Sequence, residues 1–349
     1  MRAIVAHAPH DLRLDEREAA GDPGPGEVRL RLAVGGICGS DLHYYHNGGF
    51  GTVRLREPMI LGHEVSGTVE ALGKGVSKLA IGDIGALNPS RACGHCEECR
   101  RGLPNQCLDM VFNGSAMRFP HVQGLFRETL TVPEAQLIKA EGVADASLLA
   151  LAEPFAVCLH AARRAGDLFG RTVVVFGCGP IGCLAVAAAK LAGAAKIVAC
   201  DVHDAPLKIA EALGADRLVN TAANPGDLDD LKAGKGRTDC VFECSGHPGA
   251  LAAALEILRP RGRLVTVGLG GAIEVPMSLV VTKEIEAVGS FRFDEEFAVA
   301  VNLIASGRAD LSPLVTHRMP AARAIEAFDL ASDRSQAMKI HLDLQDWDG

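Results

Sequence analysis

The chain has 349 residues, of which 48% are hydrophobic and 22% are charged, so it can bury a sizeable core and is not intrinsically disordered. Its 35 basic residues are outnumbered by 43 acidic ones, and the formal charge of -8 disfavours binding to nucleic acid or to anionic lipid. The first residues do not have the pattern of a secretory signal, and no run approaches the ~18 apolar residues of a membrane helix. We therefore expect a cytoplasmic protein, and the length favours two domains.

The first part of the chain, residues 1–150, is interrupted by many glycines and prolines. Short β-branched runs, such as residues 65–69, lie between them. This pattern predicts a β-rich unit with many loops.

From residue 171 onward, strand and helix signals alternate. Apolar runs at residues 172–176 and 196–200 are typical of buried strands, and the alanine-rich residues 181–191 are typical of a helix. The alternation predicts a doubly wound parallel sheet of the α/β class over residues 151–291. Further strands are expected at residues 217–219, 240–244, 263–267 and 285–288, with helices ending near residue 213 and spanning 249–258.

The last part of the chain, residues 292–349, does not continue this alternation. It carries a helical pattern at residues 295–305 and a final helix–strand pair ending near residue 344. We expect it to return to the first domain.

A glycine-rich loop lies between the first expected strand and helix of the alternating region. Gly177, Gly179 and Gly182 form G-x-G-x-x-G, a motif that carries weight only in this context. The first glycine permits a tight turn, the second lets a pyrophosphate approach the backbone, and the third allows the helix to pack closely. Pro180 and Ile181 begin the helix, whose free amides would face the anion.

Asp201 ends the next expected strand, at about the ~20-residue spacing typical of an acid that binds the adenosine ribose. Its carboxylate would repel a 2'-phosphate, so NAD is favoured as cofactor. His203 and Lys208 lie nearby and leave room for NADP. The alternative is that the glycines serve packing alone and that Asp201 begins a turn.

Four of the eleven cysteines crowd into one short stretch. Cys93, Cys96, Cys99 and Cys107 have the spacing C-x2-C-x2-C-x7-C, which can place four thiolates around one zinc ion. Because this shell leaves no position for water, the ion is expected to be structural. An iron–sulfur cluster and metal-free thiols are the alternatives. A zinc-ribbon module for nucleic acid would share the pattern, but the acidic balance disfavours it.

A second set of metal-ligand residues is dispersed along the sequence. Cys38, His63, Glu64 and Glu153 offer a thiolate, an imidazole and two carboxylates. Mixed ligands with an open position suit a catalytic zinc that takes a substrate oxygen. Spacing alone does not show that these side chains meet, and the alternative is that Cys38 belongs to the core and His63 to a structural hydrogen bond.

In order and spacing, the motifs resemble those of the zinc-dependent medium-chain dehydrogenases. The resemblance rests on Gly-Ile-Cys38-Gly-Ser40-Asp41-Leu-His43, Gly62-His63-Glu64, Ala-Glu153-Pro, the four cysteines and the glycine loop, and it covers essentially the whole chain. Within that family the sequence is most similar to L-idonate 5-dehydrogenases and their polyol-dehydrogenase relatives. The stretches that indicate this are residues 43–45, 88–90, 113–117, 119–121, 244–248 and 289–293.

The resemblance implies a GroES-like catalytic domain over residues 1–150, a Rossmann domain over 151–291 and a C-terminal return over 292–349. It implies two zinc ions per subunit and a homo-oligomer, commonly a tetramer. The catalytic zinc would be held by Cys38 and His63, with Glu64 and Glu153 ligating by turns. Which glutamate binds directly is left open.

The implied reaction is hydride transfer to NAD from the C5 hydroxyl of L-idonate, giving 5-keto-D-gluconate. Ser40 and His43 resemble a hydroxyl–imidazole proton relay, and Glu153 is a second candidate base. A neutral-polyol dehydrogenase of the sorbitol or xylitol type is the alternative activity. A nucleotide-binding protein without catalysis is a further alternative, but every metal-ligand residue is present.

A sugar-acid substrate carries a carboxylate and several hydroxyls, so its pocket needs a cation and polar side chains. Arg292 is the first candidate for the carboxylate. Tyr45, Ser115 and His121 are candidates for the hydroxyls. The alternative for Arg292 is a structural ion pair.

Overall fold

The computed structural model describes residues 1–348, which divide into two compact units. The first unit joins residues 1–153 to the C-terminal residues from Phe297 onward, and the second spans Pro154–Glu296. The C-terminal segment therefore packs with the N-terminal part of the chain. The boundaries lie at residues 153 and 296, whereas the sequence placed them at 150 and 291.

The second unit contains a six-stranded parallel sheet in the order β15-β14-β13-β16-β17-β18. In chain order this is 3-2-1-4-5-6, the order of doubly wound dinucleotide-binding sheets, so the predicted α/β class is confirmed. Residues such as Val173 and Val174 are fully buried because helices cover both faces of the sheet. The strands are β13 (Thr172–Phe176), β14 (Lys196–Asp201), β15 (Arg217–Asn220), β16 (Thr238–Glu243), β17 (Leu258–Thr266) and β18 (Glu286–Gly289).

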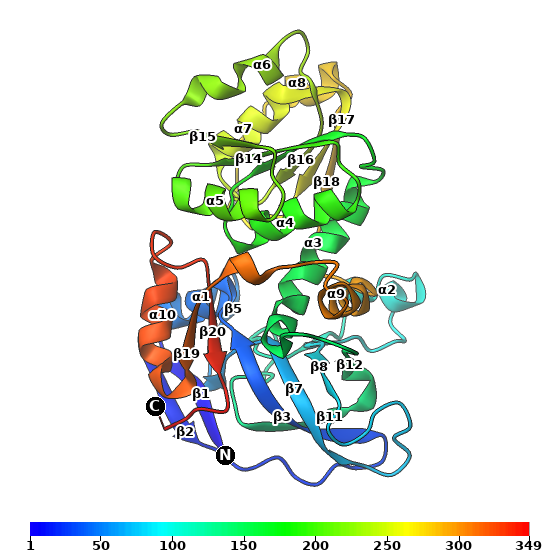
Figure 1. The fold of residues 1–349 in the computed structure, drawn as a ribbon, viewed down its shortest axis with the longest axis vertical. Coiled ribbons are helices and arrows are strands. Elements are labelled where there is room, and N and C mark those ends of the chain that lie inside the picture. The colour runs from blue at the N-terminus through cyan, green and yellow to red at the C-terminus, as the bar shows by residue number, and fades with distance from the viewer. Residues whose placement is uncertain (349) are drawn as a thin grey trace. The chain divides into compact units, whose positions relative to one another are not determined.

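Helices cover this sheet, with α4 and α5 on one face and α7 on the other (Figure 1). The helices are α4 (Pro180–Leu191), α5 (Asp204–Ala212), α6 (Asp229–Lys232), α7 (Pro248–Ile257) and α8 (Met277–Thr282), with the 3-10 turn η4 (Pro225–Leu228).

One helical stretch, Ala146–Ala165, is long and apolar enough for a membrane span by length and composition alone. It joins η3 (Ala146–Leu151) to α3 (Ala152–Ala165), and 61% of its most apolar window is buried inside the protein, as in a core helix.

The first unit is built around a seven-stranded sheet in the order β12-β8-β7-β3-β20-β19, with β11 also paired to β3. The C-terminal strand β20, red in Figure 1, pairs with the N-terminal strand β3, and β19 pairs with β20 on its other side. The strands of this sheet are β3 (Glu27–Gly36), β7 (Glu64–Leu72), β8 (Ile84–Leu87), β11 (Thr129–Pro133), β12 (Leu137–Lys139), β19 (Val315–Pro320) and β20 (Lys339–Asp343).

Smaller elements complete this unit. Its other strands are β1 (Arg2–Ala8), β2 (Asp11–Glu16), β4 (Gly49–Phe50), β5 (Val53–Arg54), β6 (Met59–Ile60), β9 (Ser90–Arg91) and β10 (Val111–Phe112). Its helices are α1 (Gly39–Asn47), α2 (Glu97–Arg100), α9 (Glu296–Ala305) and α10 (Ala324–Ser332), with 3-10 turns η1 (Pro104–Gln106), η2 (Glu134–Gln136), η5 (Ser312–Leu314) and η6 (Ala321–Arg323).

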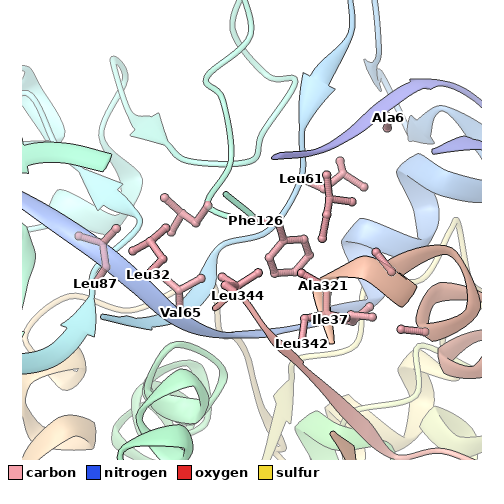
Figure 2. Close-up of a cluster of buried hydrophobic side chains, with 14 of the residues drawn as sticks. Ala6, Leu32, Ile37, Leu61, Val65, Leu87, Phe126, Ala321, Leu342 and Leu344 are labelled. Carbon is pink, nitrogen blue, oxygen red and sulfur yellow. The ribbon is translucent and has the colours of Figure 1, made fainter. Parts of the chain in front are cut away.

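The core of the first unit centres on Phe126, which Figure 2 shows among Leu61, Ala321 and Leu344. Its ring lies so close to Gly62 that a Cβ there would be 2.3 Å from Phe126 Cδ1. Gly62 also has a φ of +90°, a conformation that residues with a Cβ rarely adopt. The packed ring therefore fixes the backbone immediately before His63.

Candidate active site

Three of the dispersed ligand residues converge in the first unit. One ligand atom from each of Cys38, His63 and Glu64 lies within 4.8 Å of the other two. The convergence follows from the ladder between β3 and β7, in which Gly36 pairs with Glu64. Cys38 follows the end of β3, and His63 directly precedes β7. Both His63 and Glu64 are buried.

Glu153 lies in the first turn of α3 and is also buried. It is close enough for its charge to act on His63, but among the described residues it does not join the set whose ligand atoms are all within 4.8 Å. The structure thus places all four expected ligand residues around one region and brings three of them into direct reach of one ion.

Asp41 holds this arrangement together, although the sequence analysis gave it no role. Its carboxylate is fully buried and accepts the amide N–H groups of Cys38 and Gly62, each at 3.0 Å. One of its oxygens, Oδ1, lies 3.7 Å from Nδ1 of His63. The imidazole therefore turns Nδ1 toward Asp41, which leaves Nε2 for a metal ion. The C-x-x-D spacing at the start of a helix is the signal that could have identified it.

The electrostatics of the site favour a cation. Burial opposes a charge on His63, but the Asp41 carboxylate, the Cys38 thiolate and the Glu153 carboxylate outweigh burial and raise the pKa of His63 well above its usual value. Within residues 1–348, Nδ1 of His63 is a buried polar atom without a hydrogen-bond partner. A divalent ion would take the place of the proton that this environment attracts, so the residues fit zinc.

Lys339 supplies a positive charge beside these negatively charged side chains. Its Nζ donates to Glu64 Oε1 at 2.9 Å, to Glu64 Oε2 at 2.8 Å and to the carbonyl of Ile37 at 2.9 Å. Sequence reasoning missed this residue because a single lysine in a C-terminal strand carries no motif.

The four cysteines of the second metal site also come together. Their Sγ atoms all lie within 4.8 Å of one another, and the Cys93–Cys99 and Cys96–Cys107 pairs are both 4.0 Å apart. Four sulfurs at ~2.3 Å from one tetrahedral ion would be roughly 3.8 Å apart. Backbone amides of Cys99 and Leu108 donate to Cys96 and lower the pKa of its thiol to about 6. The lobe therefore fits a four-thiolate zinc site.

The glycine loop has the geometry expected of a phosphate-binding turn. Gly177 has a φ of +82° and faces Ser245, and a Cβ on Gly182 would lie 1.8 Å from the carbonyl oxygen of Gly177. A Cβ on Gly179 would meet nothing within 4 Å, so the space beside it is open. Gly179 is the N-cap of α4, whose first-turn amides are free for an anion.

Asp201 ends β14, as predicted. Its Oδ2 accepts the amide of Cys178 at 2.7 Å, and its Oδ1 accepts the amide of His203 at 3.0 Å. These bonds fix the carboxylate beside the glycine loop, where an adenosine ribose would bind.

Two of the residues expected to bind substrate hydroxyls have their polar atoms engaged within the protein. Tyr45 donates its hydroxyl to Asp329 at 2.8 Å. Nε2 of His121 accepts the amide of Arg56 at 2.9 Å, and its Nδ1–H donates to the carbonyl of Arg118 at 2.8 Å. These bonds use the polar atoms of both side chains within the protein, and the expected substrate roles of Tyr45 and His121 stay predictions.

The other two candidates are Ser115 and Arg292. Ser115 is buried, and its Oγ accepts the amide of Met117 at 3.3 Å, so its hydroxyl proton is still available. Arg292, in the second unit, has a φ of +54° and stacks its guanidinium over Phe291 at 4.9 Å.

Ser40 and His43 lie on α1, directly after Cys38. Ser40 is half-buried and His43 is exposed. Residues three apart on a helix share a face, so Ser40 and His43 lie on one face of α1.

Comparisons with known proteins agree with this geometry. Residues 180–306 match the family model described as zinc-binding dehydrogenase, and residues 24–142 match the alcohol dehydrogenase GroES-like domain. The chain is 46% identical over 314 residues to L-idonate 5-dehydrogenase (NAD(P)(+)) of Escherichia coli, covering 90% of each chain. It is 36% identical over 342 residues to human sorbitol dehydrogenase, covering 94% of this chain and 91% of the relative.

A solved structure extends the likeness to three dimensions. The crystal structure of L-idonate 5-dehydrogenase from Escherichia coli matches with a TM-score of 0.92 and 43% identity, over 98% of this chain and 97% of that one. The chain belongs to the zinc-binding alcohol dehydrogenase family with a GroES-like domain.

Proposed function

We propose that this protein is an NAD(P)-dependent dehydrogenase that oxidises the C5 hydroxyl of L-idonate. The observation that carries the proposal is the convergence of Cys38, His63 and Glu64 in a family whose relative at 46% identity is named for that reaction. The nucleotide-binding loop at Gly177–Gly182 supplies the second requirement of a dehydrogenase.

Two zinc ions per subunit are part of the proposal. Cys93, Cys96, Cys99 and Cys107 would hold a structural ion, and Cys38, His63 and a glutamate would hold the catalytic one. When bound, the catalytic ion supplies a Lewis acid for the substrate hydroxyl, and NAD supplies the hydride acceptor.

The chain's own residues move the proton released by oxidation. The Ser40 hydroxyl would pass it to His43, whose exposed imidazole would exchange the proton with solvent. Glu153, buried in the first turn of α3, is the second candidate base.

Arg292 and Ser115 are proposed to recognise the substrate. Replacing a charge-assisted hydrogen bond typically costs ~1.5–3 kcal/mol, or roughly 10–100-fold in binding. Arg292→Leu should therefore raise the KM for a sugar acid by that factor and leave the KM for a neutral polyol nearly unchanged. Equal effects on both substrates would assign Arg292 to a structural ion pair.

A neutral polyol is the second candidate substrate, because a relative at 36% identity is a sorbitol dehydrogenase. Purified protein with NAD or NADP and either L-idonate, sorbitol or L-threonine separates the candidates by the rate of reduced-cofactor formation. The proposal expects the highest kcat/KM with L-idonate. A preference for sorbitol would replace the substrate, and no turnover with any of them would overturn the activity.

Location and assembly complete the proposal. The enzyme is proposed to work in the cytoplasm as a homotetramer on a small-molecule substrate, with NAD preferred to NADP because Asp201 is fixed beside the glycine loop. Size-exclusion chromatography with light scattering measures the subunit count directly.

A further inference from the structure

The turn that follows β16 lies beside the glycine loop, at the carboxyl edge of the sheet in the second unit. Strands β13 and β16 are neighbours in the sheet but not in the chain, so the strand order reverses between them. In doubly wound sheets a dinucleotide binds outside the carboxyl ends of the strands at that point. Phe176 ends β13 and pairs with Glu243, which ends β16, so the turns after these two strands begin side by side.

The two turns are in direct contact through their backbones. A Cβ on Gly177 would lie 2.8 Å from the Cβ of Ser245 and 2.9 Å from its amide nitrogen. The turn after β16 also packs against the turn after β17, since a Cβ on Gly268 would lie 2.3 Å from the amide nitrogen of Gly246. A displacement of residues 245–247 would therefore change the surroundings of the glycine loop.

One buried carboxylate fixes the turn after β16. Glu243 is 2% exposed, and its Oε1 accepts the amides of Ser245 at 2.9 Å and of Gly246 at 3.0 Å. Its Oε2 accepts the Gly246 amide as well, at 3.0 Å. The Ser245 hydroxyl donates to Oε1 and accepts the amide of His247 at 3.1 Å. Three consecutive residues thus depend on this side chain, directly or through one hydroxyl.

The donors show what this carboxylate does. Within residues 1–348, Glu243 receives its hydrogen bonds from the amides and the hydroxyl of its own turn, and none from a lysine or an arginine. These bonds offset the cost of burying its charge. The sheet does not need the side chain, because the Cys244 amide donates to Phe176 and the Val267 amide donates to the carbonyl of Glu243, both at 2.9 Å. The carboxylate therefore orders the turn and not the strand.

We propose that Glu243 is a positioning residue of the dinucleotide site: its carboxylate holds residues 245–247 against Gly177, so that the surface beside the glycine loop is formed before the cofactor binds. This inference rests on the proposed function. Binding to an ordered turn does not cost the free energy of ordering it, so the loss of Glu243 should weaken cofactor binding.

Binding of NADH, followed by its fluorescence, tests the proposal without any substrate. Glu243→Gln keeps the size of the side chain but replaces one oxygen with an NH₂ group, which cannot accept an amide N–H. The dissociation constant for NADH should rise ~10-fold, the lower end of the range for a hydrogen bond to a charged group. In turnover, the KM for NAD should rise by the same factor, and the KM for the alcohol substrate should be nearly unchanged.

Glu243→Asp separates position from charge. This variant keeps the charge, but its carboxylate is one methylene farther from the amides of Ser245 and Gly246. It should also weaken NADH binding, and wild-type affinity in this variant would overturn the proposal. Hydrogen exchange of residues 244–249 gives a second readout, because the Ser245 and Gly246 amides should exchange faster in both variants when no cofactor is bound.

Asp239 is the matched control. It lies near the opposite end of the same strand, and its Oδ2 also accepts a backbone amide, that of Thr172 at 2.7 Å. Asp239→Asn should lower the Tm without changing the affinity for NADH. If it weakens NADH binding as much as Glu243→Gln does, the effect is a general loss of stability and the proposal is overturned.

Ser245→Ala keeps the test valid if the Glu243 variants do not fold. Ser245 is exposed, and its replacement removes the link to the His247 amide but leaves the backbone bonds to Glu243 in place. The dissociation constant for NADH should rise roughly 2–10-fold, the contribution of a neutral hydrogen bond. If the Glu243 variants do not fold and Ser245→Ala binds NADH as the wild type does, the proposal is overturned.

The outcomes distinguish this inference from the proposed function. If the wild-type protein binds NADH and the folded Glu243 variants bind it equally well, the positioning role is overturned and the function stands. If the wild-type protein binds neither NADH nor NADPH, both fall.

Discussion

Asp41 shows how a single carboxylate can position two metal ligands at once. It caps the amide of Cys38 through one oxygen and reaches the amide of Gly62 and the imidazole of His63 through the other. Cys38 and His63 come from different segments. The Asp41 carboxylate contacts both segments, so the ligands have less conformational freedom to lose when they bind the ion.

Asp41→Asn should therefore weaken zinc binding at the catalytic position and kcat/KM by ~10–100-fold, while the zinc in the cysteine lobe is retained. Competition with a chelator measures the affinity. Asp329→Asn, which removes the charge of the exposed acceptor of Tyr45, is the control and should not change zinc binding. Unchanged affinity in the Asp41 variant would show that His63 is oriented without it.

At the same scale, we expect Asp201 to act on cofactor choice. Its replacement by Asn would remove the charge that opposes a 2'-phosphate and would weaken a bond to the ribose. A hydrogen bond to a charged group contributes ~1.5–3 kcal/mol, so the KM for NAD should rise at least about 10-fold. The ratio of kcat/KM for NAD to that for NADP measures the effect. A ratio that stays constant would mean that Asp201 serves only the amides of Cys178 and His203.

At the scale of elements, the loop that carries His63 requires a glycine at position 62, because the ring of Phe126 leaves no space for a larger side chain there. Gly62 combines a φ of +90° with a Cβ position inside that ring. Backbone strain and steric overlap therefore act on the same residue, directly beside a metal ligand.

Gly62→Ala should lower the free energy of unfolding by ~2–6 kcal/mol, the sum of about 1–3 for the strained backbone and 1–3 for overpacking. Gly75→Ala isolates the first contribution, since Gly75 has a φ of +86° and open space around it. Thermal unfolding of both variants provides the comparison. Equal losses in the two variants would show that the Phe126 ring moves aside at no cost.

Strand β20 also carries a buried histidine, His341. Neither ring nitrogen has a hydrogen-bond partner among the described residues, and burial, with the charges of Lys339 and Arg318, lowers the pKa of His341 to about 3. The unfolded chain titrates at ~6.5, so between pH 6.5 and 3 it binds a proton that the folded state does not. Stability must then fall as the pH falls through this window.

His341→Phe removes this dependence. By pH 5 the variant should gain about 2 kcal/mol over the wild type relative to their difference at pH 8. Urea unfolding at both pH values gives the two differences. The same gap at pH 5 and pH 8 would mean that His341 is protonated when folded.

At the scale of the whole molecule, we expect the two proposed metal sites to divide stability from turnover. The cysteine lobe contains little regular structure apart from α2 and η1, so an ion there would take the place of a core. The catalytic ligands, in contrast, are held by strands that already pack around Phe126.

Cys96→Ser and Cys38→Ser should therefore behave differently. The first should lose the lobe zinc, lower the Tm and open residues 93–107 to proteolysis. The second should lose activity and the other zinc with little change in Tm. Elemental analysis with calorimetry measures both. If the two variants lost the same ion or the same stability, the assignment of the sites would be wrong.

Much of this molecule follows from local sequence. The strand at residues 172–176 and the helix beginning at the glycine loop were predicted to within a residue, because a buried parallel strand and a helix start have strong local signals. Helix α1 was not predicted, since it begins at a glycine and contains few apolar residues. The hydrogen bonds of Tyr45 and His121 were also missed, because their partners lie far away in the sequence or belong to the backbone.

By itself, the sequence predicted the fold class, the four-cysteine lobe and the glycine loop, because each depends on residue types at short or fixed spacing. The dispersed candidate ligands Cys38, His63, Glu64 and Glu153 were proposed mainly from the resemblance to a family, because their spacing alone does not bring them together. Only the tertiary structure decided that Asp41 and Lys339 belong to the metal centre and that Glu64 is held by both oxygens. Those contacts arise where β20 returns beside β3, and a pairing between strands about 300 residues apart leaves no periodic trace in the chain.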